Sequence, residues 1–190
     1  MKQPVLFVLV FFSWIVCHAA PVFVEGQDYK VLTNHSMLSE EQQQGTVIVK
    51  EFFSYGCPWC YKLESEITSW RKELPKSVTL SKVPVIFEAD WELYAKAYYA
   101  AEILGLERRI SYNLFHEIQV KKNKVDTEKA MITFFMRNGI SEKVATSAFT
   151  SSPTIDAKVR EGIAQMQMLQ VNAVPSFVIN NHYKVDIAMA

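Results

Sequence analysis

The sequence predicts an α/β protein, because a strand pattern, a helix pattern and a long helical block follow one another along one chain of 190 residues. Residues 46–53 form a nearly continuous run of β-branched and aromatic side chains, which is typical of a strand buried on both faces. Residues 58–74 carry apolar side chains at steps of four, three and four, which is the period of a helix. Residues 90–170 are helical in pattern almost throughout.

The remaining elements are predicted from turn and cap residues. Residues 29–32 and 77–87 are strand candidates, and Pro84 places the end of the second strand at the sheet margin. Asp90 is expected to cap a helix that Gly105 closes. The other predictions are helices at 111–120, 127–138, 142–149 after Ser141, and 153–170, then a hairpin turn at Asn180 and Asn181 between two short strands.

The first 19 residues have the layout of a secretory signal peptide. Lys2 precedes an apolar run of about 12 residues, and the small residues Ala19 and Ala20 follow. A membrane-spanning helix needs roughly 20 apolar residues, so an anchor fits this run less well. A lipid-modified Cys17 is a third interpretation, and the bulky Val16 before it argues against it. We therefore predict cleavage after Ala19 and export.

The composition gives no indication of a strongly charged binding surface. The chain has 20 basic and 20 acidic residues, and removing residues 1–19 removes Lys2 and no acid. We therefore expect no nucleic-acid partner. The export signal says more about function than the net charge does. It leaves Cys57 and Cys60 as the cysteines of the mature chain, in a compartment that permits disulfides.

Cys57 and Cys60 stand three positions apart, where the predicted strand gives way to the predicted helix. Pro58 suits the first helical position, which places Cys57 at the helix N-terminus and Cys60 one turn inside. Residues three apart on a helix have Cβ atoms roughly 5–6 Å apart, a separation that a disulfide can join. Such a disulfide would close a very short loop, so it would stabilise the fold little.

A metal site and thiol–disulfide exchange are the two other uses of this pair. A zinc site needs more ligands, and His35, His116 and His182 are far from the cysteines in sequence and unpaired in spacing, so we expect no metal and no cofactor. Exchange requires a thiolate, which a helix N-terminus favours by up to about 2 kcal/mol, or roughly 1.5 in pKa. A larger effect would need hydrogen bonds to the sulfur from the backbone N–H groups of Trp59 and Cys60.

The motif EFFSYGCPWCYKLE resembles the active-site segment of the DsbA family, periplasmic thiol:disulfide interchange proteins of the thioredoxin superfamily. The resemblance extends over nearly the whole exported chain, through EGQDYKVL, LSKVPVIF and VNAVPSFVINNHYKV. It implies a thioredoxin-like fold with an inserted all-helical domain. The implied organisation is a signal peptide at 1–19, a discontinuous thioredoxin-like domain at 20–89 and 171–190, and a helical insertion with its connecting helix at 90–170.

The resemblance also implies roles for individual residues. Cys57 becomes the nucleophile and Cys60 the resolving thiol of a redox-active Cys57–Cys60 disulfide. Val174 and Pro175 become a loop with a cis-proline that faces the disulfide and pairs with an extended client chain. From the residues alone, Pro175 could equally be the start of an edge strand.

Glu51 lies inside the apolar strand, six positions before Cys57. Taken alone, it could be a strand residue at an exposed edge. The resemblance implies instead a buried carboxylate near the disulfide, with Lys82 as its partner. A buried carboxylate holds its proton more readily, and it could relay protons to Cys60 during exchange.

The chain departs from the family pattern in two places. The dipeptide between the cysteines is Pro58-Trp59, whereas the best-known oxidase of the family has Pro-His. Trp59 has no cationic form, so the oxidising strength of that oxidase does not carry over directly. The sequence also ends 15 residues after Pro175, so we expect the C-terminal helix of the family to be absent.

The predicted function is an exported dithiol oxidase that donates its CPWC disulfide to folding secreted proteins through a mixed disulfide. The resemblance implies a periplasmic location, unfolded or partly folded exported proteins as clients, and a quinone-linked inner-membrane DsbB-like partner for reoxidation. We expect a monomer. The alternatives are a disulfide isomerase or reductase and, from a different class, a non-catalytic client- or metal-binding module of the same fold.

Overall fold

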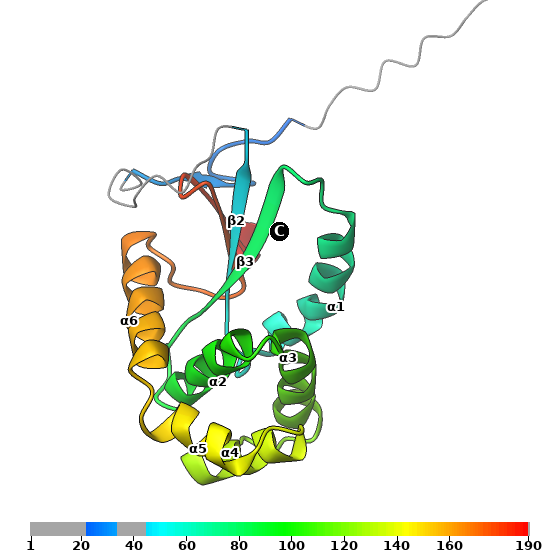
Figure 1. Cartoon of the computed structure of the whole chain (residues 1–190). Helices are drawn as coiled ribbons and strands as arrows, with labels where there is room; N and C mark the ends of the chain where they lie inside the picture. The colour runs from blue at the N-terminus through cyan, green and yellow to red at the C-terminus, as the bar shows by residue number, and fades with distance from the viewer. Residues whose placement is uncertain (1–21, 34–44, 190) are drawn as a thin grey trace, which may run out of the picture.

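A central strand, β2, organises this computed structural model, which describes residues 22–33 and 45–189 (Figure 1). The predicted signal peptide, Cys17 and His35 lie outside the described residues. In chain order the elements are β1 (Lys30–Val31), β2 (Val47–Phe53), α1 (Pro58–Glu73), β3 (Val78–Pro84), α2 (Trp91–Ile103), α3 (Glu107–Phe115), the π-helix η2 (His116–Val120), α4 (Glu128–Arg137), α5 (Glu142–Thr150), α6 (Pro153–Met168), β4 (Ser176–Ile179), β5 (Tyr183–Asp186) and the 3-10 helix η3 (Ile187–Met189).

The five strands form one mixed sheet with the order β1-β5-β4-β2-β3. β2 runs parallel to β3 and antiparallel to β4, and its register pairs Glu51 with both Lys82 and Phe177. The last five residues of β2 are buried, as its apolar run predicted. β3 ends at Pro84 on the edge of the sheet, where a missing N–H costs no ladder hydrogen bond.

Helices flank the sheet and gather at one end of it. Figure 1 shows α1 and α6 on opposite sides of β2 and β3, and α2 to α5 grouped near the point where β2 leads into α1. This arrangement confirms the predicted α/β class. Within the described ranges, no helix is both long enough and apolar enough to cross a bilayer.

Helix α1 begins and ends where the sequence predicts. Cys57 has extended backbone at the N-cap position and Pro58 follows in the first turn. The helix stops before Leu74, whose backbone is extended as expected of a residue that precedes proline. Its apolar face is only partly covered, because Ile67 is buried whereas Trp70 is 39% exposed.

Some details of the helical block, residues 90–170, differ from prediction. The helix predicted at 111–120 begins earlier, at Glu107, and continues as a π-helix after Phe115. No side chain caps its start, so the sequence carried no signal for it. Asp90 stands at the N-cap position of α2 but makes no capping hydrogen bond, because its own backbone is already helical. Ser141 also makes no capping bond before α5.

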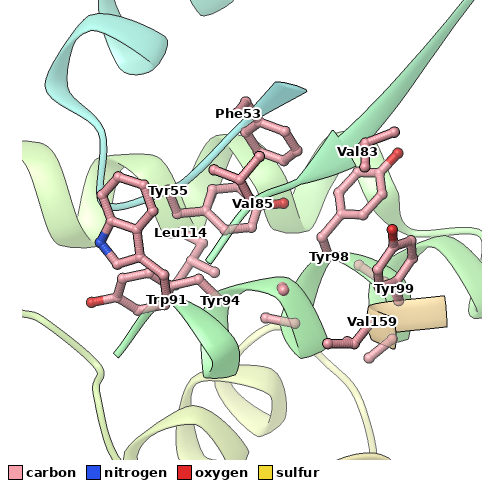
Figure 2. Packing of buried hydrophobic residues seen from close by; sticks show 14 of the residues in the cluster. Phe53, Tyr55, Val83, Val85, Trp91, Tyr94, Tyr98, Tyr99, Leu114 and Val159 are labelled. Carbon is pink, nitrogen blue, oxygen red and sulfur yellow. The ribbon is translucent and has the colours of Figure 1, made fainter. Parts of the chain in front are cut away.

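A core cluster joins the sheet to the helical block (Figure 2). Phe53 of β2 packs edge-on against Tyr98 of α2, with ring centroids 5.4 Å apart. Phe115 of α3 packs against Tyr55 at 4.8 Å. Five aromatic residues of the helical block are buried in this cluster: Trp91, Tyr94, Tyr98, Phe134 and Phe135. The domain boundaries at 89/90 and 170/171 stay a prediction.

The predicted turn at Asn180 and Asn181 joins β4 to β5. Both residues have positive φ, at 51° and 53°, and the N–H of His182 donates to the carbonyl of Ile179 at 2.9 Å. Asparagine tolerates this left-handed conformation better than most residues do. Antiparallel pairing of β4 with β2 brings the loop before β4 back to the start of α1.

Candidate active site

A tight turn between β2 and α1 carries the first cysteine. The N–H of Cys57 donates to the carbonyl of Ser54 at 3.1 Å, and the hydroxyl of Ser54 accepts from the N–H of Gly56 at 3.1 Å. The chain then becomes extended at Cys57 (φ −85°, ψ 115°) and enters the helix. Cys60 lies one turn inside α1 and is fully buried. In this structure both cysteines are free thiols.

The sulfur of Cys57 contacts both its own helix and a distant loop. Its Sγ accepts a hydrogen bond from the N–H of Cys60 at 3.2 Å, in the manner of an N-cap side chain. Its thiol donates to the carbonyl of Val174 at 3.5 Å. The peptide bond between Val174 and Pro175 is cis. A loop 117 residues further along the chain therefore lies directly against the sulfur.

The two thiols differ strongly in acidity. The pKa of Cys57 falls from its usual 9.0 to about 7, first because the Cys60 thiol donates to its sulfur, and then because the backbone N–H groups of Cys60 and Trp59 do so. Burial and the charge of Glu51 oppose this shift. The pKa of Cys60 is raised far above its usual range, mainly by burial and then by its hydrogen bond to Cys57. Near neutral pH the negative charge therefore develops on Cys57 while Cys60 keeps its proton.

A buried cluster of charges lies near the pair. Lys82 Nζ is 3.1 Å from Glu51 Oε2 and 2.5 Å from Glu64 Oε2, and the side chains of Glu51 and Lys82 are 0% and 1% exposed. Glu51 is thus not at an exposed edge. Burial raises its pKa above the usual 4.5, and Lys82 offsets this only in part. Neither oxygen of Glu51 accepts an aligned hydrogen bond from the described residues.

Glu51 acts on the cysteines electrostatically. Its negative charge raises the pKa of both Cys57 and Cys60. Burial alone would lower the pKa of Lys82, but the carboxylates of Glu51 and Glu64 raise it instead, so the lysine stays charged. The arrangement is one buried cation between two carboxylates, of which Glu51 has a raised pKa.

An apolar groove lies next to Trp59. This side chain is 55% exposed, and Lys62 Nζ lies 4.1 Å from the centroid of its ring as a cation–π pair. A cavity of about 340 Å³ is lined by Trp59, Lys62, Leu63, Pro175, Phe177, Val185, Asp186 and Ile187. Most of these side chains are apolar.

The described histidines pack elsewhere. His116 stacks on Tyr112 in the helical block, and His182 packs against Tyr183 in the hairpin. Among the residues that the structure describes, no group of three or more His, Cys, Asp or Glu side chains could hold a metal ion.

The structure brings the sequence-predicted residues together, because Val174 contacts Cys57 and the β2–β3 register sets Glu51 beside Lys82. Sequence reasoning missed Glu64, the second partner of Lys82. A signal was present, since Glu64 follows Cys60 by four positions and so shares its helix face.

A mixed sheet whose central strand leads into a helix with Cys-X-X-Cys at its start, faced by a cis-proline loop, defines a thioredoxin-like dithiol protein. The chain belongs to the DsbA family. Its residues 82–189 match the family model described as "DSBA-like thioredoxin domain". The fold predicted from the resemblance is thereby confirmed, and the protein is a thiol:disulfide oxidoreductase.

Known relatives agree with this assignment. The chain is 30% identical over 170 residues to the thiol:disulfide interchange protein DsbA of Burkholderia cepacia, covering 90% of this chain and 78% of that protein. It matches a crystal structure of Pseudomonas aeruginosa DsbA with a TM-score of 0.80 and 28% identity, covering 88% of this chain and 85% of that one. The oxidoreductase DsbA from Xylella fastidiosa matches with a TM-score of 0.76 and 25% identity, covering 85% and 87%.

Proposed function

We propose that this protein is an exported dithiol oxidase that passes a Cys57–Cys60 disulfide to folding client proteins. The observation that carries the proposal is the difference between the two sulfurs. The thiol pKa of Cys57 is far lower than that of Cys60, because Cys57 lies at the start of a helix among N–H donors while Cys60 is buried. A stabilised thiolate favours the reduced form of the pair, which makes the disulfide an oxidant.

In the reaction, a client thiolate attacks Cys57 Sγ of the oxidised enzyme. The Cys57–Cys60 bond breaks, a client–Cys57 disulfide forms, and Cys60 leaves as a thiolate that takes up one proton. A second client thiolate then attacks the client sulfur, so the client leaves oxidised and Cys57 leaves as a thiolate. The client loses two electrons in total, and they reduce the enzyme disulfide to the dithiol.

Glu51 is the group that we assign to the proton on Cys60. Burial raises its pKa above the usual 4.5, which favours the protonated form that a proton donor needs. Lys82 balances the charge when the proton leaves. The high pKa of Cys60 means that its thiolate takes the proton readily.

Clients are unfolded or partly folded exported proteins in this proposal. The loop of Val174 and Pro175 presents backbone next to the reacting sulfur, and backbone pairing accepts many sequences. The neighbouring groove at Trp59 takes apolar client side chains. Residues 1–19 direct the chain to the periplasm, where a quinone-linked DsbB-like membrane protein reoxidises the monomeric enzyme.

Trapping of mixed disulfides tests the proposal. In the Cys60→Ala variant, expressed with its own export signal, the Cys57 thiolate can attack a disulfide of an exported protein and no Cys60 thiol remains to release it. Covalent adducts between Cys57 and exported proteins should therefore accumulate, and a reductant should release them. The Cys57→Ser variant is the matched control and should form none. An export-competent, folded Cys60→Ala protein without adducts would contradict the proposed function.

A reductase or isomerase is the second candidate, and one observation favours it. The Cys57 pKa of about 7 is close to the value of about 7 typical of thioredoxin and well above the roughly 3.5 of a strongly oxidising DsbA. The reduction potential separates the two. A value near −120 mV indicates an oxidase, whereas a value near −270 mV indicates a reductase, both being approximate reference values.

A further inference from the structure

The turn that carries Cys57 is held by the helical block as well as by its own hydrogen bonds. Gln119 lies in the π-helix η2, and its Nε2 donates to the carbonyl of Tyr55 at 2.7 Å. Tyr55 precedes Cys57 by two positions but is separated from Gln119 by 64. This hydrogen bond joins the backbone of the turn directly to a side chain of the helical block.

The π-helix that carries Gln119 is held in place by a backbone hydrogen bond and by ion pairs. Its wide turn is closed by a bond from the N–H of Lys121 to the carbonyl of His116 at 3.0 Å. Glu117, in the same turn, is almost fully buried and is held by Lys121 Nζ at 2.8 Å and by Arg137 at 3.2 Å. One side chain of the turn is thus anchored within the helical block while another reaches the active-site turn. Single π-turns inside helices often occur at functional sites.

Two further observations show that the turn is packed closely against the helical block. The hydroxyl of Tyr55 lies 2.6 Å from that of Ser111 on α3, and Tyr55 is completely buried. A Cβ on Gly56 would lie 2.3 Å from the indole nitrogen of Trp91 on α2. Figure 2 shows Tyr55 among side chains of the helical block and the sheet. Tyr55 is therefore held by α3 and Gly56 packs closely against α2, while Gln119 binds the Tyr55 carbonyl between them.

We propose that Gln119 is a positioning residue for the nucleophile: its hydrogen bond to Tyr55 holds the turn so that Cys57 stays over the first turn of α1 and against Val174. The sulfur depends on this placement, because its 3.2 Å bond from Cys60 and its 3.5 Å contact with Val174 both require Cys57 to stay where the turn ends. The inference rests on the proposed function only in assigning Cys57 as the reacting cysteine.

The test compares Gln119→Met and Gln119→Glu with the unmodified protein. Methionine is close to glutamine in shape and has no N–H, and a glutamate carboxylate accepts rather than donates. We expect alkylation of Cys57 in the reduced protein by iodoacetamide at neutral pH to slow by roughly 3- to 10-fold, the effect of one lost hydrogen bond. The ultraviolet titration of the thiolate should shift toward higher pH in parallel, and client-peptide oxidation should slow by a similar factor.

Two controls separate positioning from loss of stability. Thr127→Ala removes a cap that accepts from the N–H of Ala130 at 3.2 Å, so it should lower the melting temperature and leave Cys57 alkylation unchanged. Gln167→Met makes the same chemical change at an exposed site on α6 and should change neither the melting temperature nor the rate of Cys57 alkylation. If both Gln119 variants fold and alkylate with the unmodified rate and titration, the inference is wrong. If the unmodified protein alkylates at Cys57 but oxidises no peptide, the proposed function fails and the alkylation comparison still tests Gln119.

Discussion

At the scale of single residues, position along one helix separates the two cysteines. Cys57 stands just outside the first turn, where free N–H groups point at its sulfur, and Cys60 stands inside, where no water reaches it. The same side chain becomes a stabilised anion in one place and a proton holder in the other. An exchange enzyme needs this difference, because one sulfur must be attacked and the other must leave.

The stability of the reduced protein should depend on pH in a defined way. Folding lowers the Cys57 pKa from 9.0 to about 7. Its contribution to the free energy of unfolding is therefore complete above pH 9 and is lost as the pH falls through 7. The raised pKa of Cys60 gives a contribution that is present below its unfolded value of 9.0 and lost at higher pH. The reduced form should therefore gain stability over the oxidised form from about pH 7 to pH 9, by at most about 3 kcal/mol, and lose it above.

Urea unfolding of both redox forms across this range measures the difference. The Cys57→Ser variant forms no Cys57–Cys60 disulfide, so its own free energy of unfolding is compared with that of the reduced native protein: the rise between pH 7 and pH 9 should be absent, and the fall above pH 9 should remain. A difference that does not vary with pH would show that the Cys57 thiol ionises as it does in an unfolded chain.

Glu51→Gln should lower the Cys57 pKa, because the charge of Glu51 raises it in the native protein. The variant should also slow the first attack by a client thiolate, since Cys60 leaves without its proton donor, by about tenfold or more. Lys82 keeps Glu64 as a partner, so the fold should persist. Thiolate titration and single-turnover peptide oxidation measure the two effects.

The matched control is Glu66→Gln, which removes an exposed carboxylate from the same helix as Glu64. It should alter neither quantity. A Glu51→Gln protein with the native Cys57 titration and the native turnover rate would remove Glu51 from the mechanism and leave it a structural residue.

At the scale of elements, the junction of β2, its turn and α1 concentrates the chemistry. The strand sets Glu51 beside Lys82 through its register with β3, and the turn then delivers Cys57 to the helix start within a few residues. The distant β4 contributes the loop that faces the sulfur, because antiparallel pairing with β2 brings Ser176 opposite Phe52.

Gly56→Ala tests how tightly this junction is packed. The added Cβ would lie 2.3 Å from Trp91 Nε1, and the rigid indole cannot yield as a flexible chain end could. We expect the free energy of unfolding to fall by about 1–3 kcal/mol, the usual cost of overpacking. In a double-mutant cycle with Trp91→Leu, the double variant should lose less free energy of unfolding than the two single variants lose together, because the smaller side chain removes the overlap. Additive losses in urea unfolding would show that the two residues do not touch.

At the scale of the whole molecule, the core continues from the sheet into the helical block. Phe115 of α3 contacts Phe53 of β2, the turn residue Tyr55 and Tyr61 of α1, with ring centroids 4.8 to 6.1 Å apart. The inserted block is therefore packed against the same cluster that supports the active-site turn. It has no separate hydrophobic core in the described part of the chain that would let it unfold alone.

We expect one cooperative unfolding transition. Far-ultraviolet circular dichroism and tryptophan fluorescence should give coincident curves in urea. Phe115→Ala should shift both curves together, with a loss of about 3–5 kcal/mol. Two separated transitions, or a shift in one probe alone, would mean that the helical block is an independent unit.

Predictability from the sequence follows the range of the interactions involved. The start of α1 was predictable because Cys57 and Pro58 are local signals, and so was the turn at Asn180 and Asn181. The start of α3 was not, since no capping side chain marks it. Asp90 looked like a cap, but its helical backbone leaves the side chain without that role.

The sequence by itself determined that a Cys-X-X-Cys pair begins a helix behind a buried strand, because strand period, proline and helix period act within a few residues. The tertiary structure alone decided which groups surround the sulfur. Val174 reaches Cys57 from the loop before β4, Gln119 reaches the turn from η2, and Glu64 of α1 meets Lys82 of β3 across the sheet–helix contact. These contacts depend on sheet register and helix packing. Hydrogen bonds and charges act over a few ångströms in space, whatever the separation along the chain, so the acidity of Cys57 becomes defined only when the chain is folded.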